Sequence, residues 1–406
     1  MAATAHAPST VVNPGRFVAT KGIKTLYTVC IFLGILTLAL GLLGKGEGSS
    51  ARIWHSYLTS YFYFTTISLG GLFWVAVNNV ANAGWSVNVR RIAEALTSFL
   101  PIAAVGAIVL LLGSKNLYVW LDEHHVAQDY LLQAKHAYLN QTFFIIRLVA
   151  FFAIWLFFAA KIVGNSVKQD ATGEDNLTVR NAKLSVAFIL MFALSYSFFS
   201  VDLLMSLQPH WYSTIWGVYN FAGMFQSTMA TMILICLFCM KNGWVRGLIN
   251  ENHVHDLAKY MKGFTIFYAY IGFSQFLLIW YANLPEETIF YLNRSQGGWM
   301  IMSFSLLIFK FAVPFLLLLP RWAKRTPSHL IMVSILILIM QYVDVHWMVY
   351  PNLDNSRVLF GWQEIGMFLG FLGLFVFSVT RFLEKNNLIP IKDPRIGESL
   401  VHEVTY

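Results

Sequence analysis

Charged residues are scarce in this chain of 406 residues, and cysteines are scarcer. Asp, Glu, Lys and Arg make up 12% of the sequence, about half their share in an average soluble domain, whereas 57% of the residues are hydrophobic. A soluble globular fold is therefore excluded, and lipid is the expected solvent. Because the three cysteines, Cys30, Cys236 and Cys239, all lie in apolar stretches, neither a disulfide framework nor a four-thiolate cluster site can be built.

A cleavable signal sequence and a basic face for nucleic acid are also missing. The segment Met1–Pro14 is small and polar and lacks a positively charged start followed by an apolar run. The formal net charge of +8 comes from lysines and arginines that form short clusters between apolar runs rather than one continuous face. We therefore expect no signal peptide and no nucleic-acid partner.

Ten apolar runs are long enough to cross the roughly 30 Å of a bilayer's hydrocarbon core as helices. Helix is expected because backbone groups in lipid must bond within their own segment, and no alternating barrel pattern is present. The sequence thus predicts an all-α integral membrane protein with ten transmembrane helices. The spans lie near Leu26–Leu43, Tyr57–Asn78, Ala95–Leu112, Phe143–Ala160, Leu184–Asp202, Ile215–Met240, Met261–Leu284, Trp299–Leu319, His329–Tyr350 and Phe360–Phe382.

Basic residues are distributed unevenly between the two sides of these spans. Of the 28 lysines and arginines, Arg147 and Lys310 fall within spans, six lie on the side opposite the N-terminus, and the other 20 lie on the side of the N-terminus. Because loops rich in Lys and Arg stay in the cytoplasm, both termini are predicted to be cytoplasmic. The six residues on the opposite side are Lys45, Arg52, Lys115, Lys135, Arg294 and Arg357.

Short signatures recur in spans that are four helices apart. Span two begins with Trp54-His55-Ser56 and span six with Trp211-Tyr212-Ser213, and spans four and eight both follow a Tyr-Leu-Asn triplet. Spans five and nine end in Val-Asp, at Asp202 and Asp344, with a proline seven residues later. A shift of four helices preserves direction through the membrane, so the repeat is parallel.

The repeat predicts two four-helix bundles, formed by spans two to five and six to nine, with two peripheral helices outside them. The corresponding divisions are residues 1–50 for the N-terminus and span one, 51–208 for the first bundle, 209–352 for the second, and 353–406 for span ten and a cytoplasmic tail.

Lys310 is the most unusual residue, because it lies about 16 Å into span eight and close to the bilayer midplane. A charge at that depth costs at least ~2.5–3.5 kcal/mol unless it faces protein or water. We therefore expect Lys310 to point into a bundle, where it is a candidate proton-relay group. A lysine that is neutralised by one structural partner, or that snorkels to the interface, is the alternative.

Asp202 and Asp344 occupy equivalent positions in the two halves and are further proton-transfer candidates. Each could pass a proton to a nearby histidine, His210 or His346, because histidine exchanges protons near neutral pH. The alternative is a carboxylate held at a helix end by backbone donors or an arginine, with Arg147 as the obvious partner. Internal hydroxyls and amides could order a water wire or only join helices; they are Tyr196, Ser197, Ser200, Asn220, Gln226, Ser274, Gln275 and Gln341.

The chain is not expected to carry a catalytic residue, a metal or a cofactor of its own. A b-type haem needs two histidines that face each other deep within helices, whereas the eleven histidines here fall in tails, loops and span ends. Cys236 and Cys239 have redox-motif spacing but lie in an apolar run without basic neighbours. The loop Gly113–Thr142 has helical spacing from Val119 to Leu139, which fits a docking segment or a solvated amphipathic helix.

Four segments resemble one known family of membrane subunits. They are Lys135–Arg147 (KHAYLNQTFFIIR), Asp202–Gly223 (DLLMSLQPHWYSTIWGVYNFAG), Ile279–Arg294 (IWYANLPEETIFYLNR) and Val343–Pro351. They are similar to the NrfD/polysulfide-reductase membrane-subunit family, specifically to the two paralogous quinol-subunit-like chains of alternative complex III. The resemblance covers most of spans four to nine and is closer to the shorter, ActF-like paralogue.

The resemblance implies a cofactor-free, non-catalytic subunit of a quinol:electron-acceptor oxidoreductase in the bacterial inner membrane, which anchors redox subunits and is a candidate proton conductor. Haem c and iron–sulfur clusters would belong to periplasmic partner subunits. A larger, ActC-like quinol subunit, lipids and a terminal oxidase are the other expected partners. An independent secondary transporter and a pure structural scaffold are the alternatives, although Pro101 and Pro314 do not form the repeated pair of broken helices that transporters show.

Overall fold

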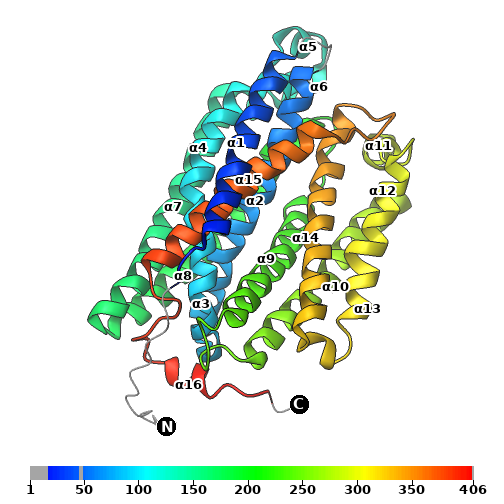
Figure 1. The fold of residues 1–406 in the computed structure, drawn as a ribbon. Coiled ribbons are helices and arrows are strands. Elements are labelled where there is room, and N and C mark those ends of the chain that lie inside the picture. Colours follow the sequence, from blue (N-terminus) through cyan, green and yellow to red (C-terminus); the bar gives the residue numbers. More distant parts are fainter. Residues whose placement is uncertain (1–16, 45–48, 405–406) are drawn as a thin grey trace.

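The computed structural model describes residues 17–44 and 49–404, and the regular secondary structure of these residues is helical. Ten helical segments among them are long and apolar enough to cross a membrane, so the predicted all-α integral membrane protein with ten spans is confirmed (Figure 1). The expectations for Met1–Pro14, Arg16 and Lys45 concern residues outside this description.

Eight of the ten spans are single helices, and the other two are composites of shorter helices. In chain order the spans are α1 (Lys21–Leu43), α2 (Ser49–Val80), the composite η1–α3–η2–α4 (Gly84–Leu112), α7 (Gln141–Thr172), α8 (Asn176–Leu203), α9 (Trp216–Lys241), α10 (Glu251–Ala282), the composite α12–η6–α13 (Trp299–Leu317), α14 (Pro327–Val349) and α15 (Trp362–Lys385).

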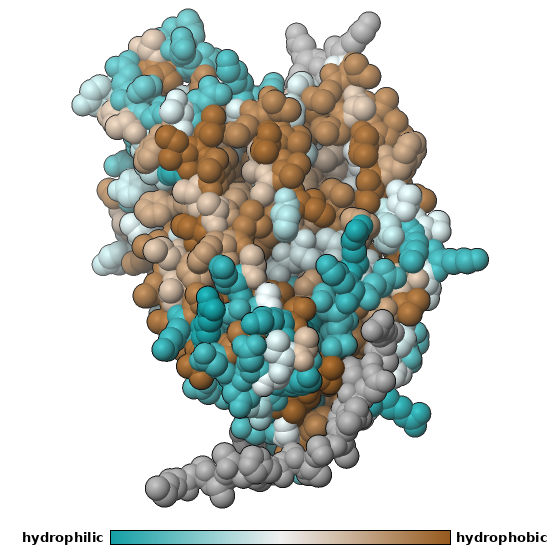
Figure 2. Space-filling view, turned by 90° about the vertical axis from the view of Figure 1, so that its left-hand side faces the viewer, coloured by the Kyte–Doolittle hydropathy of each residue, from teal (hydrophilic) through white to brown (hydrophobic). Residues whose placement is uncertain are grey.

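The outer surface of the helical body suits a lipid environment. Large apolar side chains in the middle of spans are exposed, including Ile35 (65% exposed), Leu190 (67%) and Leu307 (56%). Figure 2 shows hydrophobic residues in a broad band, with hydrophilic residues gathered toward the two ends of the body. A continuous apolar surface of this kind would not be stable in water.

The two ends of the body are named here by the elements that they carry. The terminal face is the end at which α1 begins and α15 ends, and α16 (Ile396–Leu400) lies there (Figure 1). The loop face is the opposite end, which carries the short helices α5 (Glu123–Gln128), α6 (Tyr130–Lys135) and α11 (Pro285–Asn293).

Eight of the spans form two rings of four with the same cyclic order. In the first ring α2 packs on α4 (Leu100–Leu112), α4 on α7, α7 on α8, and α8 back on α2. In the second ring α9 packs on α10, α10 on η6 (Leu306–Ala312), η6 on α14, and α14 back on α9. The rings meet where α9 and α14 contact α2 and where α9 contacts α8. Equal order in both rings is the arrangement that the four-helix sequence repeat requires.

The first and last spans pair with each other outside these rings. α1 packs along α15, and α15 packs on α2 and α3. Gly34 and Gly370 allow the close approach, because a Cβ atom on Gly34 would lie 2.3 Å from the Cα atom of Gly370. Small residues at such a crossing let two helix backbones touch within a membrane.

The third span begins earlier than the sequence suggested. Its helix α3 (Val87–Leu96) includes Arg90 and Arg91, which lie before the start of the predicted span Ala95–Leu112. Both guanidinium groups are buried: Arg90 pairs with Asp393 at 2.7 Å, and Arg91 pairs with Glu94 at 2.6 Å and with Asp170 at 2.7 Å. These ion pairs tie the third and fourth spans and the C-terminal segment together at the terminal face.

The long loop at the loop face forms two short helices instead of one long one. Asp122 and Asp129 are the N-cap residues of α5 and α6, and their side chains accept hydrogen bonds from the backbone N–H groups of His124 and Leu131. An N-cap residue has an extended backbone, so the second aspartate interrupts the helix that the spacing suggested.

Candidate functional site

A buried ion pair joins two helices in the interior of the second bundle. The Nζ atom of Lys310, in the composite eighth span, donates to Oδ2 of Asp344 in α14. The Lys310 side chain is fully buried, and Asp344 is 1% exposed. Lys310 therefore points into a bundle, as the sequence predicted, and its partner is the carboxylate that the sequence had marked separately.

The helix that carries Lys310 is locally widened. Residues Leu306–Ala312 form a π-helical turn between α12 (Trp299–Ser305) and α13 (Val313–Leu317). Pro314 explains the change, because proline has no N–H to donate to the carbonyl of Lys310 four residues earlier and its ring would clash with that carbonyl. The freed carbonyl accepts a hydrogen bond from Nε2 of Gln226 in α9 at 3.3 Å.

Two tyrosines complete the surroundings of Asp344. The hydroxyl of Tyr219 in α9 donates to Asp344 Oδ1 at 2.6 Å, and that of Tyr268 in α10 donates to the same atom at 3.1 Å. The two hydroxyl oxygens are 2.7 Å apart, and Lys310 Nζ lies 3.8 Å from the centre of the Tyr268 ring. All four helices of the second bundle thus contribute a side chain to one buried charged centre.

Further polar side chains extend from this centre toward the terminal face. Gln226 Nε2 also donates to the hydroxyl of Thr265 in α10 at 2.9 Å, and both residues are fully buried. Gln341 in α14 is 3% exposed, and neither Gln226 Oε1 nor Gln341 Oε1 has a hydrogen-bond partner among the described residues. Gly223 leaves space for Gln341, since a Cβ atom there would lie 2.8 Å from Gln341 Oε1. Buried amide oxygens without partners are typical binding points for internal water.

Polar side chains also continue toward the loop face. Gln275, two helical turns beyond Tyr268 on α10, donates to the hydroxyl of Tyr291 at 3.1 Å. Its Oε1 atom accepts a hydrogen bond from Ser213 at 2.9 Å. Ser213 is partly exposed at the loop face, so this group of residues connects the bundle interior with the surface.

The equivalent carboxylate of the first bundle is held in a different way. Arg147 Nε donates to Asp202 Oδ2 at 2.7 Å, and the Tyr138 hydroxyl donates to Oδ1 at 2.9 Å. The guanidinium group of Arg147 also donates to the carbonyl of Tyr138 and lies over the rings of Tyr138 and Phe143. Asp202 thus has the arginine partner that the sequence analysis named as the structural alternative.

The two histidines proposed as proton acceptors do not pair with these aspartates. His210 lies within 2.5 Å of Asp129, a residue of the loop that precedes α6. The pKa of Asp129 is lowered: burial would raise it, but hydrogen bonds from backbone N–H groups and the nearby His210 ring outweigh burial. His346 follows Asp344 by two residues and therefore projects from another side of α14, where its ring stacks on Tyr350 at 3.8 Å between centroids.

The sequence analysis missed another buried carboxylate, that of Glu364. Glu364, at the start of α15, is fully buried and accepts two hydrogen bonds from Arg52, at 2.9 and 2.8 Å. The hydroxyl of Tyr350 donates to the same carboxylate at 2.6 Å, and the backbone N–H of Gly361 at 2.7 Å. An acidic residue at the edge of an apolar run was the available signal, but its partner lies 312 positions away in the chain.

The described residues contain no group of three or more His, Cys, Asp or Glu side chains that could hold a metal ion. Cys236 and Cys239 are free and buried. Lys310, Asp344, Tyr219 and Tyr268 are protonatable groups in direct contact with one another, so the centre can exchange protons between them.

The chain was also compared with known proteins. No protein-family model matches it, and no curated protein is significantly similar to it.

Proposed function

We propose that this chain is a membrane subunit that conducts protons through its second four-helix bundle, with Lys310 and Asp344 as the central relay. The observation that carries the proposal is the buried ion pair itself, to which all four helices contribute and which has polar side chains on both sides. Ionisable residues inside membrane proteins commonly mark proton or ion pathways, because burying them is otherwise unfavourable.

The hydrogen-bond pattern around Asp344 suits a relay. Tyr219 and Tyr268 have two hydroxyl protons between them, whereas three short oxygen–oxygen contacts join them to each other and to Asp344. The protons can therefore be redistributed without movement of the heavy atoms. Lys310 can release a proton to Asp344 and regain one from another donor, because both groups remain solvated by protein dipoles in either state.

Water is needed to complete the path. Tyr268 and Gln275 are seven residues apart on α10, which corresponds to about 10 Å along the helix. On the other side, the buried His255 lies ten residues before Thr265, about 15 Å along the same helix. The amide oxygens of Gln226 and Gln341, which have no hydrogen-bond partner among the described residues, are where bridging waters are expected.

We further propose that the subunit works in a quinol-oxidising complex of the alternative complex III type in a bacterial inner membrane. The support is the resemblance of Lys135–Arg147, Asp202–Gly223, Ile279–Arg294 and Val343–Pro351 to that family. Haem c and iron–sulfur subunits and the larger quinol subunit would then supply the redox chemistry. The asymmetry of Lys and Arg supports a cytoplasmic terminal face. A tagged chain should co-purify with haem-c and iron–sulfur subunits; a solitary polypeptide would contradict this part.

The proton role is tested by neutralising the centre without leaving an unpaired charge. The double variant Lys310→Met/Asp344→Asn should lower the number of protons moved per electron pair while assembly and quinol oxidation continue. The matched control is Arg147→Met/Asp202→Asn, which neutralises the corresponding pair of the first bundle and should leave proton movement unchanged. Proton movement in sealed vesicles, measured with a pH-sensitive dye, separates the two; equal stoichiometry in both variants would sink the proposal.

A further inference from the structure

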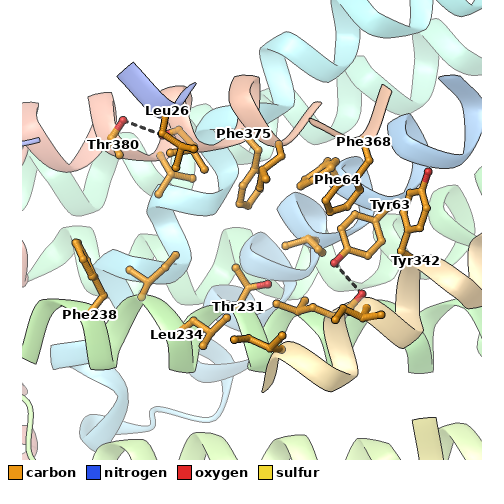
Figure 3. Close-up of a pocket in the computed structure, with 18 of the residues that line it drawn as sticks. Leu26, Tyr63, Phe64, Thr231, Leu234, Phe238, Tyr342, Phe368, Phe375 and Thr380 are labelled. Carbon is orange, nitrogen blue, oxygen red and sulfur yellow. Dashed lines mark hydrogen bonds between the residues drawn. The ribbon is translucent and has the colours of Figure 1, made fainter. Parts of the chain in front are cut away.

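An apolar groove of about 590 Å³ lies outside the two rings of helices. Its walls come from the α1/α15 pair on one side and from α9 and α14 on the other, and α2 contributes Tyr63, Phe64 and Ile67 (Figure 3). Phe17 and Phe238 line it toward the terminal face, whereas Phe360 and Glu364 line it toward the loop face. The groove therefore lies between the peripheral helix pair and the second bundle.

The hydroxyl groups that line the groove already have partners. Tyr63 donates to the carbonyl of Leu338 at 3.1 Å, and Tyr342 donates to the carbonyl of Glu364 at 3.3 Å. Thr231 and Thr380 donate to carbonyls of their own helices at 2.9 and 2.7 Å. A ligand with polar groups would lose its hydrogen bonds to water and find few replacements here, so the walls favour plain hydrocarbon.

The carboxylate of Glu364 is occupied as well. Its Oε1 accepts from Arg52, Tyr350 and Ser56, and its Oε2 accepts from Arg52 and the backbone N–H of Gly361. With five donors on two oxygens, this carboxylate has no strong site left for a ligand. A polar ring that must be recognised by hydrogen bonds, such as a quinone head, is therefore a poor occupant.

The shape of the groove selects a long, flexible chain. Its lining on α15 extends from Ile365 to Leu383, about 27 Å along the helix and close to the thickness of the hydrocarbon core. Several lining residues are also exposed to the outside, including Leu26 (55% exposed), Ile339 (56%) and Phe360 (59%). The groove is therefore open sideways to the membrane, from which an acyl chain can enter.

Basic residues gather where the groove reaches the terminal face. Lys21 and Lys24 flank the lining residue Ile23, and Lys241 follows the lining residue Phe238 by three positions, close to one helical turn. Arg381 and Lys385 lie on either side of the lining residue Leu383, and all five basic residues are exposed. Glu384 pairs with Lys24 at 3.5 Å, which leaves an excess of positive charge. Clusters of Lys and Arg at the end of membrane helices attract anionic headgroups.

We propose that the groove binds one acyl chain of an anionic phospholipid whose headgroup lies among the basic residues of the terminal face. The bound chain fills the space between α1/α15 and α9/α14 and so joins the peripheral helix pair to the second bundle. This proposal does not depend on proton conduction or on the identity of the complex.

Bound lipid can be counted by native mass spectrometry after the full chain, or the complex that contains it, is purified in mild detergent and phosphatidylglycerol is added. Leu338→Trp and Leu372→Trp each place a bulky ring in the groove and should reduce retained phospholipid at least ten-fold. Leu278→Trp, on a lipid-facing position of α10 that is 66% exposed, is the matched control and should retain it. Retention by both groove variants would overturn the proposal.

The headgroup preference is tested in the same assay with phosphatidylglycerol and phosphatidylcholine. The unaltered protein should retain phosphatidylglycerol at least ten-fold more than phosphatidylcholine, and Lys21→Gln/Lys241→Gln should remove the difference. Lys168→Gln/Lys183→Gln is the matched control, because it removes two exposed charges from the same face at positions far in the sequence from any residue that lines the groove. This variant should still prefer phosphatidylglycerol. Equal retention of the two lipids by the unaltered protein, or an isoprenoid quinone found in place of phospholipid, would overturn the proposal.

Discussion

The two four-helix bundles share one helix order but have different interiors. In the first, Phe199 stacks on Phe62 at 5.7 Å and meets Trp155 edge-on at 4.9 Å between ring centroids. Tyr219 follows Trp211 by eight residues, as Phe62 follows Trp54, and Gln341 precedes Asp344 by three residues, as Phe199 precedes Asp202. Positions that carry hydrocarbon in the first bundle thus carry a hydroxyl and an amide in the second.

This difference shows that a carboxylate at an equivalent place can have two roles. Asp202 is enclosed by Arg147 and Tyr138 near the loop face, and three residues earlier on its helix the packing is aromatic. Asp344 has polar neighbours on three other helices, and Gln341 lies on its own. The first arrangement fixes a helix end, whereas the second offers protons a sequence of donors and acceptors.

The largest expected effect comes from breaking the ion pair of the second bundle. Lys310→Met leaves Asp344 buried with no cation, and removing one partner of a buried pair typically costs about 3–5 kcal/mol. The free energy of unfolding in mixed detergent micelles should fall by that amount. Lys310→Met/Asp344→Asn should recover most of the loss, because the amide still accepts hydrogen bonds from both tyrosines.

The first bundle provides the comparison for this prediction. Arg147→Met removes the cation from Asp202, but Arg147 is 8% exposed, whereas Lys310 is fully buried. Because Arg147 itself reaches the surface, water can enter the space that its side chain leaves and solvate Asp202, so the loss should be smaller than for Lys310→Met. Equal losses would show that depth in the bundle does not distinguish the two pairs.

A second difference between the halves follows the Tyr-Leu-Asn triplets. Gln141 follows the first triplet and is exposed, whereas Arg294 follows the second and is 2% exposed. Arg294 donates to the carbonyls of Phe290, Trp347 and Met348 and so caps the end of α14. Burial lowers its pKa to about 9, so it is still charged at neutral pH.

Arg294→Gln makes the second half resemble the first at this position. The free energy of unfolding should fall by about 2–3 kcal/mol, because buried carbonyls lose charged donors that a glutamine cannot all replace. Gln141→Ala is the control and should change it by less than about 0.5 kcal/mol. Denaturation of both variants in the same detergent measures the two free energies of unfolding. A loss for Arg294→Gln as small as that for Gln141→Ala would mean that the Arg294 cap does not stabilise the protein.

How much of this was accessible from the sequence depends on the range of each interaction. The spans, the repeat and the inward direction of Lys310 follow from hydropathy, spacing and the cost of a charge in lipid. The pairing of Lys310 with Asp344 does not follow from the sequence, because these residues lie in different spans and come into contact only when span eight packs on span nine. Glu364 and Arg52 are still further apart in the chain, and nothing local links them.

Helix geometry explains the remaining differences. His346 is close to Asp344 in the sequence, but residues two positions apart on a helix do not face each other. Pro314 was visible, yet a proline alone does not reveal whether a helix kinks, breaks or widens into a π-turn. The Gln226 amide, which donates to the Lys310 carbonyl freed by that turn, lies on another helix. Local sequence therefore could not predict this contact.

The smallest effect is expected from Tyr219→Phe, which removes one hydroxyl and gives the second bundle the phenyl ring that Phe62 provides in the first. Tyr219→Phe deletes one donor to Asp344 but leaves Tyr268 and Lys310 in place. The free energy of unfolding should fall by about 1–2 kcal/mol. Proton movement should slow but not cease, because one hydroxyl still contacts the carboxylate.

Tyr196→Phe is the matched control for this last variant. Tyr196 is also buried and also donates one hydrogen bond, to the carbonyl of Asn220 at 3.1 Å, but it belongs to the first bundle and contacts no carboxylate. Its removal should cost a similar free energy and leave proton movement unchanged. If both variants slow proton movement equally, the effect arises from general loosening of the helices, and the contrast between the two interiors has no bearing on proton conduction.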